Sequence, residues 1–240
     1  MNEKRENPRL STIIPAFNEG DTIGITLNQL QRSLSKHSFY NEIIVVDDGS
    51  FDNTGIIARE HGADKVIRNY RSQGKNRAIA IGLECSKESI IVLMDADGKY
   101  DPNDIPNLIS PIEKGEADIV IGLNIPQNGI SQGTKVANII FEFLYRFLTG
   151  KILRTGYPWS GLKIFRREIL MELVKSDFQN GIDFNLELKY FALKNKYRLI
   201  EIPLRTRLRK SVGYSRPEKR RTFRYGLKIL KRILLEAVNG

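Results

Sequence analysis

The chain contains 240 residues, enough for one large domain or for one domain with an appendage. Hydrophobic residues make up 41% and charged residues 28%, which is typical of globular proteins and excludes a fibrous or wholly disordered chain. The formal net charge of +10 comes from residues 198–240, because this stretch holds 13 Lys and Arg against 3 acidic residues. A basic stretch on a neutral body predicts a polyanionic partner: phosphates, nucleic acid or an anionic membrane face.

Neither a membrane-spanning helix nor a secretory signal is expected. The longest apolar run, residues 90–94, is far shorter than the roughly 18 residues of a spanning helix. The charged residues 1–6 lead into no apolar stretch of the kind found in secretory signals. Cys85 is the single cysteine and cannot form an internal disulfide, so we expect a reducing, cytoplasmic location.

Residues 8–122 alternate between short apolar runs and helical segments. The first predicted helix, residues 21–35, has four apolar residues at helical spacing and Asp21 at the expected N-cap. The strands are expected at residues 10–14, 42–46, 65–67, 89–94 and 118–122, and the further helices at 54–60, 75–85 and 102–114. Apolar strands that alternate with helices predict an α/β fold, with a mostly parallel sheet covered on both faces.

The second half of the chain is less regular. Its expected elements are a polar loop at 124–133, a helix at 134–148, a strand at 159–165, helices at 166–174 and 184–194, a strand at 199–208 and a helix at 218–238. Pro203 interrupts the alternation of the last strand. The regular alternation of residues 8–122 therefore does not continue in this half.

Two acidic clusters directly follow predicted strands. Asp47 and Asp48 come after the second strand, and Asp95 and Asp97 come after the fourth. Because ligands of parallel sheets bind at the carboxyl ends of the strands, we expect both clusters to meet at one edge. Asp95 and Asp97 can hold one hard divalent cation that bridges the diphosphate of a nucleotide. A solvated turn is the alternative for this pair.

The first cluster also has two interpretations. Asp47 and Asp48 can accept hydrogen bonds from a base or from a ribose hydroxyl. The alternative is a turn with a helix cap at Ser50 or Asp52. We expect both at once, with Asp52 and Thr54 capping the helix and Asp47 and Asp48 facing the cleft.

Further short motifs join these clusters in order along the chain. They are residues 15–19 (PAFNE), 46–50 (VDDGS) with Asp52 and Thr54, 74–78 (GKNRA) running to Gly82, 95–98 (DADG) with Asp101 and Pro102, Ser160 and Gly161 with 165–168 (FRRE), Glu187, and 200–203 (IEIP). The set covers about residues 9–216 and resembles the family 2 glycosyltransferases of GT-A fold, within them the dolichol-phosphate mannose synthase branch. The resemblance implies a Rossmann-like, mostly parallel sheet with helices on both faces. It also implies a glycosyltransferase catalytic domain at 8–216. The alternating pattern predicts the nucleotide-binding half at 8–122, which leaves the acceptor half at 123–216. Residues 217–240 lie beyond the resemblance, and their own pattern predicts a basic amphipathic helix.

The resemblance further implies a set of site residues. The nucleotide sugar would be bound by Pro15, Phe17, Glu19, one or both of Asp47 and Asp48, Lys75, Asp95, Lys135, Ser215 and Arg216. Asp95 and Asp97 would hold Mg²⁺ or Mn²⁺, with Asp97 as the more direct ligand. Arg209 or Lys210 would contact phosphate.

Four positions depart from the pattern of the branch. Lys99 stands where Gln is usual, and since an ammonium cannot ligate a cation, it either swings away or replaces some of the metal's charge. Asn124 replaces an Arg that binds phosphate, and Lys135 matches a downstream Arg. Tyr157 replaces an Asp. These departures leave the identities of the sugar and the metal open.

The acceptor decides whether the reaction needs a general base. A lipid monophosphate needs none, because it is already an anion at pH 7, with a second pKa of about 6. His37 and His61 lie on predicted helix termini, away from the strand ends. A hydroxyl acceptor would need a carboxylate base, for which Asp183 and Glu187 are the candidates, although Glu187 can also be a helix-surface residue. A single displacement inverts the anomeric centre, as the resemblance also implies.

Residues 218–238 predict a basic amphipathic helix. Its apolar residues fall in one narrow sector and its basic residues opposite, namely Phe223, Leu227, Leu230 and Leu234 against Arg221, Arg224, Lys228, Lys231 and Arg232. Such a helix lies in the headgroup region, where each Lys or Arg near an anionic leaflet adds about 1 kcal/mol. The alternative is a terminal helix that packs on the body with its basic face in solvent.

We therefore predict a metal-dependent, inverting glycosyltransferase that is peripheral at the cytoplasmic face of a membrane. It would move a hexose-type sugar from GDP-mannose or a UDP-hexose to polyprenyl (dolichyl) phosphate, with Mg²⁺ or Mn²⁺ as cofactor. An anionic membrane surface is an expected partner, and nucleic acid is not. A glycan or protein hydroxyl is the alternative acceptor. A second alternative, suggested by Lys99, Asn124 and the basic tail, is a catalytically impaired protein that binds nucleotides or nucleic acid.

Overall fold

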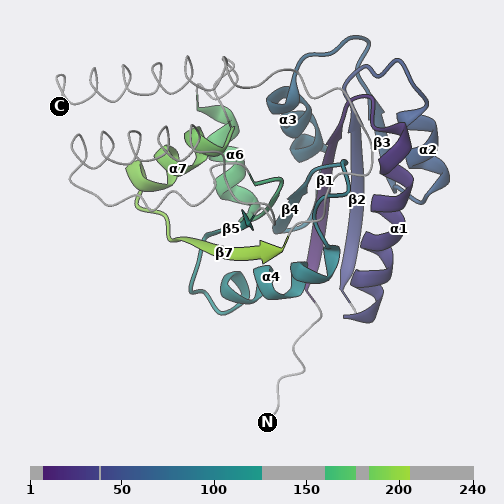
Figure 1. Ribbon diagram of the computed structural model, residues 1–240. Coiled ribbons are helices and arrows are strands. Elements are labelled where there is room, and N and C mark those ends of the chain that lie inside the picture. Colours follow the sequence, from purple (N-terminus) through teal and green to yellow (C-terminus); the bar gives the residue numbers. More distant parts are fainter. Residues whose placement is uncertain (1–7, 38, 126–159, 177–183, 206–240) are drawn as a thin grey trace.

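The computed structural model describes residues 8–37, 39–125, 160–176 and 184–205, which form a seven-stranded sheet flanked by helices (Figure 1). The strands are β1 (Arg9–Ala16), β2 (Tyr40–Asp47), β3 (Lys65–Arg68), β4 (Ile90–Met94), β5 (Ile119–Ile125), β6 (Leu162–Arg166) and β7 (Leu199–Arg205). The helices are α1 (Gly20–Lys36), α2 (Thr54–Glu60), α3 (Lys75–Cys85), α4 (Ile105–Glu113), α6 (Arg167–Lys175) and α7 (Phe184–Lys194), with a 3₁₀ turn at Pro102–Asp104 before α4.

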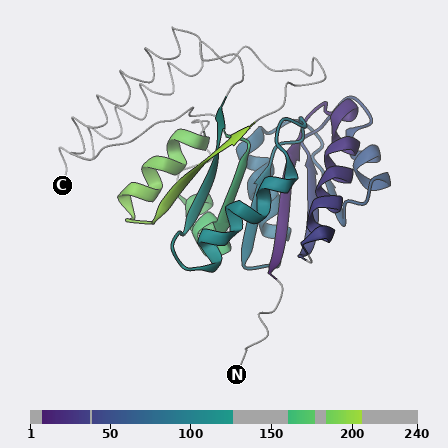
Figure 2. The same ribbon diagram turned by 60° about the horizontal axis from the view of Figure 1, so that its bottom comes forward.

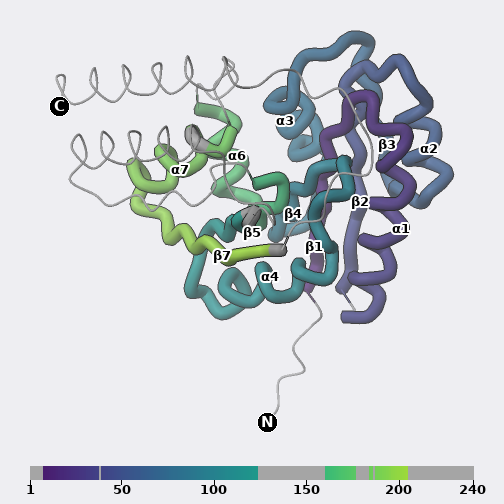
Figure 3. Tube along the Cα trace, in the orientation of Figure 1, coloured from purple at the N-terminus to yellow at the C-terminus, as the bar shows by residue number. Residues whose placement is uncertain are grey.

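The sheet is mostly parallel, as predicted. Its strand order is β3-β2-β1-β4-β6-β5-β7. Strands β3, β2, β1 and β4 pair in parallel, as do β5 and β7, whereas β6 runs antiparallel to both β4 and β5. Although far apart in sequence, β4 and β6 lie side by side (Figure 3). The expected α/β fold class is therefore confirmed.

Helices bury both faces of the sheet (Figure 2). Ile14 of β1 packs in one core with Leu27 of α1 and Leu108 of α4. Its neighbour Ile13 packs in the other core with Leu83 of α3. Successive side chains of a strand point to opposite faces, so a strand with helices on both sides is mostly apolar along its length. This is why β2 and β4 contain the unbroken apolar runs 43–46 and 90–94.

The predicted N-cap of the first helix is wrong by two residues. The N-cap of α1 is Glu19, whose carbonyl oxygen accepts hydrogen bonds from the N–H groups of Thr22 (3.0 Å) and Ile23 (2.8 Å). The turn at Asn18, where φ is 54°, brings the chain into the helix earlier than the side-chain pattern indicates. Asp21 lies instead in the first turn, where its charge faces the positive end of the helix dipole.

Pro203 does not end the last strand, because β7 lies at an edge of the sheet. A proline lacks an N–H group and is tolerated where no further strand pairs. Strand β5 extends further than predicted. It runs to Ile125 and so includes the first two residues of the predicted polar loop at 124–133. The rest of that loop and the predicted helices 134–148 and 218–238 lie outside the described residues.

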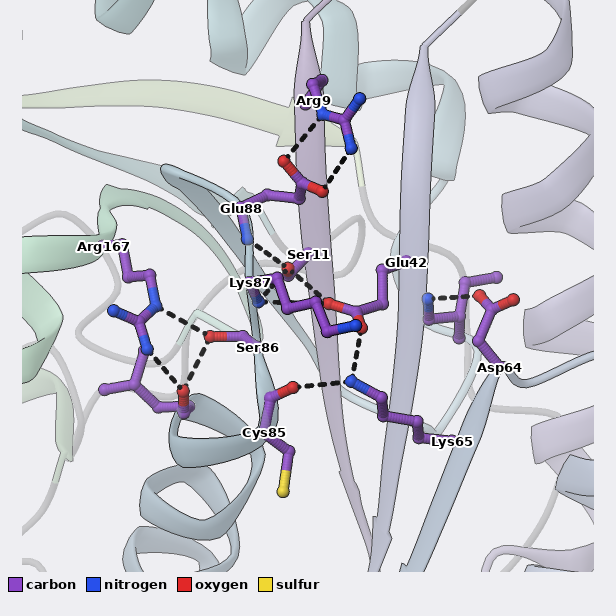
Figure 4. Close-up of polar contacts among 12 residues, drawn as sticks. Arg9, Ser11, Glu42, Asp64, Lys65, Cys85, Ser86, Lys87, Glu88 and Arg167 are labelled. Atoms are coloured by element: carbon purple, nitrogen blue, oxygen red, sulfur yellow. Dashed lines mark hydrogen bonds and ion pairs between the residues drawn. The ribbon is translucent and has the colours of Figure 1, made fainter.

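Charged side chains tie the strands together at the amino-terminal edge of the sheet (Figure 4). Glu42 of β2 accepts a hydrogen bond from Oγ of Ser11 (2.9 Å) and pairs with Nζ of Lys65 (2.5 Å). Nε of Arg9 lies 3.0 Å from Oε2 of Glu88. Burial alone would raise the pKa of Glu42, but its bonds to Lys65 and Ser11 outweigh burial and hold the pKa below its ordinary value. The acids of this edge are thus bound by partners within the protein.

Within the described ranges, no helix combines the length and the apolar character needed to cross a bilayer.

Candidate active site

Three turns meet at the carboxyl edge of the sheet, where β2, β1 and β4 end. Ala16 at the end of β1 lies beside Asp47 at the end of β2, and the N–H of Asp48 donates to the carbonyl of Ala16 (2.8 Å). Strand β4 runs parallel to β1 on its other side and ends at Met94, directly before Asp95. Both acidic clusters therefore lie at the same edge of the sheet, as expected.

Asp47 is fully buried within its own turn. Its Oδ1 accepts a hydrogen bond from the N–H of Ser50 (2.9 Å), and its Oδ2 lies 3.6 Å from Nε of Arg68. A Cβ at Gly55 would come within 2.8 Å of Oδ2, so the start of α2 encloses this carboxylate. Asp47 therefore does not occupy the predicted position facing a cleft.

Asp48 is also buried, with 4% of its surface exposed, and its carboxylate binds four protein donors. Its Oδ1 accepts from Nδ2 of Asn69 (2.8 Å) and from the N–H of Gln73 (3.0 Å). Its Oδ2 accepts from Oγ of Ser72 (2.7 Å) and from the N–H of Gly74 (2.8 Å). All four donors belong to the loop between β3 and α3, and two carboxylate oxygens offer about four acceptor sites. The carboxylate of Asp48 thus holds this loop in place and does not face a cleft, contrary to the prediction.

The loop that Asp48 holds leads to the second acidic cluster. Gly49 has φ +77°, and a Cβ there would lie 2.8 Å from the backbone carbonyl carbon of Arg71, so only a glycine lets the turn pack on the loop. Helix α3 begins at Lys75 directly after the loop, and Nζ of Lys75 lies 2.5 Å from Oδ1 of Asp95. A continuous set of contacts therefore connects the two acidic turns.

Asp95 lies between the end of β4 and the turn before β6. Its N–H donates to the carbonyl of Gly161 (2.9 Å), and a Cβ at Gly161 would collide with its Oδ2. Burial alone would raise the pKa of the Asp95 carboxyl. The ammonium groups of Lys75, Lys163 and Lys99 outweigh burial and lower this pKa, so the group is ionised at neutral pH.

Asp97 lies in the turn after β4 and is engaged by Lys99. Nζ of Lys99 lies 2.7 Å from Oδ2 of Asp97, and the N–H of Lys99 donates to Oδ1 (3.2 Å). Gly98, with φ +70°, lets the chain turn back at this point. The Asp97 side chain is 12% exposed and that of Lys99 is 37% exposed. The carboxylate therefore has limited contact with solvent, and Lys99 binds both of its oxygens.

Two further residues of this region were missed from the sequence. Lys163 of β6 is 1% exposed, and its Nζ donates to the carbonyl of Ser160. The hydroxyl of Tyr100 accepts a hydrogen bond from the N–H of Gly161 (2.7 Å), and burial raises its pKa. A lysine among the apolar residues Leu162, Ile164 and Phe165 is the signal that could have revealed Lys163, because a buried ammonium needs polar partners.

The residues that follow β1 form an aromatic rim beside the acidic turns. The rings of Phe17 and Phe51 meet edge to face, with centroids 6.2 Å apart, and Phe51 is almost fully exposed. The N–H of Asn18 donates to Oγ of Ser50 (2.9 Å), and the N–H of Phe51 donates to Oδ1 of Asn18 (2.8 Å). These bonds join the predicted nucleoside residue Phe17 to the turn after β2, while Pro15 is half-buried in β1.

The start of α2 is joined to the start of α1. Oδ1 of Asp52 accepts from the N–H of Thr54 (3.0 Å), and Oγ1 of Thr54 accepts from the N–H of Glu19 (2.9 Å). The N-cap position itself is Asn53, so Asp52 and Thr54 support the helix start from either side. Oε2 of Glu19 accepts from Oγ1 of Thr22 (2.8 Å), which orients this side chain along α1.

The remaining predicted site residues fall into two groups. Glu187 is buried on α7, so the alternative of a helix-surface residue is wrong. His37 and His61 are the C-caps of α1 and α2, consistent with the expectation that they lie on helix termini. The others lie outside the described residues: Lys135, Tyr157, Asp183, Arg209, Lys210, Ser215 and Arg216.

Asp95 and Asp97 offer the oxygen ligands that a hard divalent cation prefers. Mg²⁺ usually takes one or two protein carboxylates and completes its shell with phosphate oxygens and water. In the part of the chain that the structure describes, no group of three or more His, Cys, Asp or Glu side chains is placed to hold a metal. Two carboxylates are the number of protein ligands that such an ion usually takes when it also binds a diphosphate.

Sequence comparison identifies relatives of this chain. Residues 11–174 match the family model of Glycosyl transferase family 2. A UDP-N-acetylglucosamine–dolichyl-phosphate N-acetylglucosaminyltransferase of Methanococcus voltae is 32% identical over 217 residues, covering 81% of this chain and 84% of that protein. A dolichol-phosphate mannosyltransferase of Pyrococcus furiosus is 31% identical over 208 residues, covering 81% of this chain. The match spans 55%, or about half, of the Pyrococcus protein.

Structural comparison agrees with the sequence relatives. Glucosyl-3-phosphoglycerate synthase from Mycobacterium tuberculosis, in complex with Mg²⁺ and uridine diphosphate, superposes with a TM-score of 0.69. The match covers 96% of this chain and 79% of that chain at 22% identity, which shows a shared GT-A fold. The ordered motifs, the mostly parallel sheet and the family match lead to one conclusion: the chain belongs to glycosyl transferase family 2 and is a glycosyltransferase.

Proposed function

We propose that the protein transfers a hexose-type sugar from a nucleoside diphosphate sugar to polyprenyl (dolichyl) phosphate. The main support is the connection between the acidic turns, in which Asp48 holds the loop before α3 and Lys75 pairs with Asp95. It gathers carboxylates and ammonium groups at the sheet edge where ligands of parallel sheets bind. The two relatives named for dolichyl phosphate support this acceptor.

The leaving group of this reaction is a nucleoside diphosphate, whose negative charge must be stabilised as the sugar departs. Lys75 and Lys99 supply positive charge from the chain itself. Asp95 and Asp97 would hold Mg²⁺ or Mn²⁺, which neutralises diphosphate charge when bound. Phe17 would cover the base at the rim of the site, beside the exposed ring of Phe51.

The transfer itself is a single displacement. An oxygen of the acceptor phosphate forms a bond to the anomeric carbon while the bond from that carbon to the diphosphate oxygen breaks. The electron pair leaves with the nucleoside diphosphate, and the anomeric centre is inverted. A phosphate monoester is already an anion at neutral pH, so no proton has to be removed. The C-cap positions of His37 and His61 agree with a reaction that needs no histidine base.

A product assay tests this proposal. The purified protein is incubated with a short polyprenyl phosphate, Mg²⁺ or Mn²⁺, and GDP-mannose, UDP-glucose, UDP-N-acetylglucosamine or a UDP-uronic acid in turn. We expect one donor to yield a sugar-labelled lipid of inverted anomeric configuration in the organic phase. No lipid-linked product with any of these donors would contradict the proposal.

A glycan or protein hydroxyl is a second candidate acceptor, favoured by the buried carboxylate of Glu187. A hydroxyl must lose its proton, and Glu187 could act as the base. The variant Glu187→Gln separates the two acceptors. Unchanged transfer to polyprenyl phosphate by this variant supports the lipid acceptor. Loss of transfer to a hydroxyl acceptor, with polyprenyl phosphate inert, supports the second candidate.

We also propose that the protein acts peripherally at the cytoplasmic face of a membrane, through the basic amphipathic helix expected at residues 217–240. Deletion of these residues should weaken binding to vesicles that contain anionic lipid more than it weakens binding of the nucleotide. Vesicle flotation and a nucleotide titration measure the two effects. Equal vesicle binding by the shortened and full chains would contradict the membrane role.

A further inference from the structure

One residue, Lys99, engages the whole carboxylate of Asp97. The N–H of Lys99 donates to Oδ1 (3.2 Å), while its Nζ lies 2.7 Å from Oδ2. The first contact comes from the backbone of the turn at Gly98 and orients the carboxylate. The second comes from the end of a flexible four-carbon side chain and can be exchanged.

Without a bound metal ion, the described charged groups around Asp95 and Asp97 carry a net positive charge. Lys75 pairs with Asp95, Lys99 pairs with Asp97, and the buried ammonium of Lys163 acts on Asp95 as well. Among the residues that the structure describes, three ammonium groups thus lie around these two carboxylates. An added divalent cation is attracted by the carboxylates and repelled by the ammonium groups, and the repulsion is strongest from a group that occupies the same oxygen.

We infer that Lys99 is a tethered ammonium that competes with the divalent cation for Asp97. The cation binds Oδ2 of Asp97 when the Lys99 ammonium leaves it, and the backbone N–H of Lys99 keeps Oδ1 oriented during the exchange. Lys163 is enclosed in β6 and cannot leave. Of the two described lysines with partly exposed side chains, Lys75 pairs with Asp95 and Lys99 pairs with Asp97, so Lys99 is the one that must move from Asp97. This inference rests on the metal site of the proposed function and adds to it the residue that limits metal affinity.

A direct titration of Mn²⁺ tests the inference without any activity measurement. Free Mn²⁺ is followed by electron paramagnetic resonance in the presence of the full chain, without nucleotide. The variants are Lys99→Met, which removes the charge at similar length, and Lys99→Arg, which keeps the charge. Lys87→Met is the matched control, because Lys87 is exposed at the opposite edge of the sheet.

We expect Lys99→Met to bind Mn²⁺ about fivefold more tightly than the wild type, the change that follows from removing one partly exposed ion pair. Lys99→Arg and Lys87→Met should stay within about twofold of the wild type, because neither removes the competing charge. Circular dichroism and thermal unfolding establish that each variant is folded. If Lys99→Met does not fold, Lys99→Gln takes its place in the same titration.

Three other outcomes overturn the inference in distinguishable ways. Equal Mn²⁺ affinity of the wild type and Lys99→Met, with binding lost in Asp97→Asn, removes the role of Lys99 and leaves the proposed metal site intact. Mn²⁺ binding that is unchanged in Asp97→Asn removes both the inference and the metal site. Mn²⁺ binding that is absent from both the wild type and Lys99→Met without nucleotide removes the inference alone, because the proposed site shares its ion with a nucleotide diphosphate.

Discussion

Two acidic turns at the same edge of the sheet are built in opposite ways. After β2, the carboxylate of Asp48 accepts four hydrogen bonds from amide, hydroxyl and backbone donors of a single loop. After β4, the carboxylate of Asp97 is bound by the backbone and the flexible ammonium of Lys99. A carboxylate whose donors are built into the fold is structural, whereas one paired with a mobile ammonium can exchange that partner for a ligand.

The same distinction sorts the other acids. Glu42, at the amino-terminal edge, belongs with Asp48. It accepts from Oγ of Ser11, and the ammonium of its partner Lys65 is fixed by a second hydrogen bond to the carbonyl of Cys85 (2.8 Å). Asp95 is paired with the half-exposed Lys75 and belongs with Asp97. The structural carboxylate of Asp48 also supports the ligand-binding group, because the loop that it holds positions Lys75, which pairs with Asp95.

The largest expected effect is the loss of transfer in Asp97→Ala. We expect the rate to fall by about a thousandfold, the size seen when a group that stabilises transition-state charge is removed. Stability in urea should stay close to that of the wild type, because Asp97 is held by one neighbouring residue. Asp21→Ala, which removes an acid from the first turn of α1, is the control and should keep its rate. Near-normal turnover in Asp97→Ala would contradict the distinction between a structural Asp48 and a ligand-binding Asp97.

For Asp48→Ala we expect a large loss of stability, which is not expected for Asp97→Ala. The substitution leaves four donors of one loop without their acceptor and should cost about 3 kcal/mol or more in the free energy of unfolding. Urea denaturation measures this loss. The transfer rate should fall as well, since Lys75 loses its position, and Asp48→Asn should be intermediate because one acceptor oxygen remains. Wild-type stability combined with weaker nucleotide binding would make Asp48 a direct ligand instead.

A smaller effect is expected for Gly161→Ala, whose Cβ would collide with Oδ2 of Asp95 and the ring of Tyr100. Displacing a carboxylate of the proposed metal site by about 1 Å should lower the transfer rate by roughly tenfold to a hundredfold. Gly82→Ala is the matched control, because its Cβ would collide with Ile13 in the core. Thermal unfolding and initial rates should show both variants destabilised and only Gly161→Ala slowed. Equal slowing of the two variants would mean that crowding acts through stability alone.

The smallest effect is expected for Glu42→Gln and depends on pH. The pKa of Glu42 is lowered in the folded state, so its contribution is present above its unfolded pKa, near 4.5, and is lost as the pH falls through the folded value. At pH 7 the variant should therefore be about 1 kcal/mol less stable than the wild type, and below the folded pKa the difference should vanish. Urea denaturation at pH 7 and at a series of lower pH values measures the loss. A difference that stays unchanged over the whole acidic range in which the protein remains folded would show that charge is not the cause.

Much of the architecture could be predicted because it depends on local patterns. Residues 43–46 and 90–94 are unbroken apolar runs within strand-length segments, which indicates strands buried on both faces. Their carboxyl ends must lie at one edge once they are parallel, so the common location of Asp47 and Asp95 followed from the order of the elements. The N-cap at Glu19 could not be predicted in this way, because it depends on a backbone turn at Asn18 that the side-chain pattern does not reveal.

The sequence by itself determined the fold class, the family motifs and the edge of the sheet at which the acids lie, because each follows from residues that are close in the chain. Only the tertiary structure decided what each acid does there. The partners of Asp48 come from a loop more than twenty residues later in the chain. The charge of Lys163 acts on Asp95 from β6, which neighbours β4 in the sheet but lies far from it in sequence. The packing of α7 buries Glu187. Such partners are set by how strands and helices pack, and a carboxylate is structural or available to a ligand according to those partners.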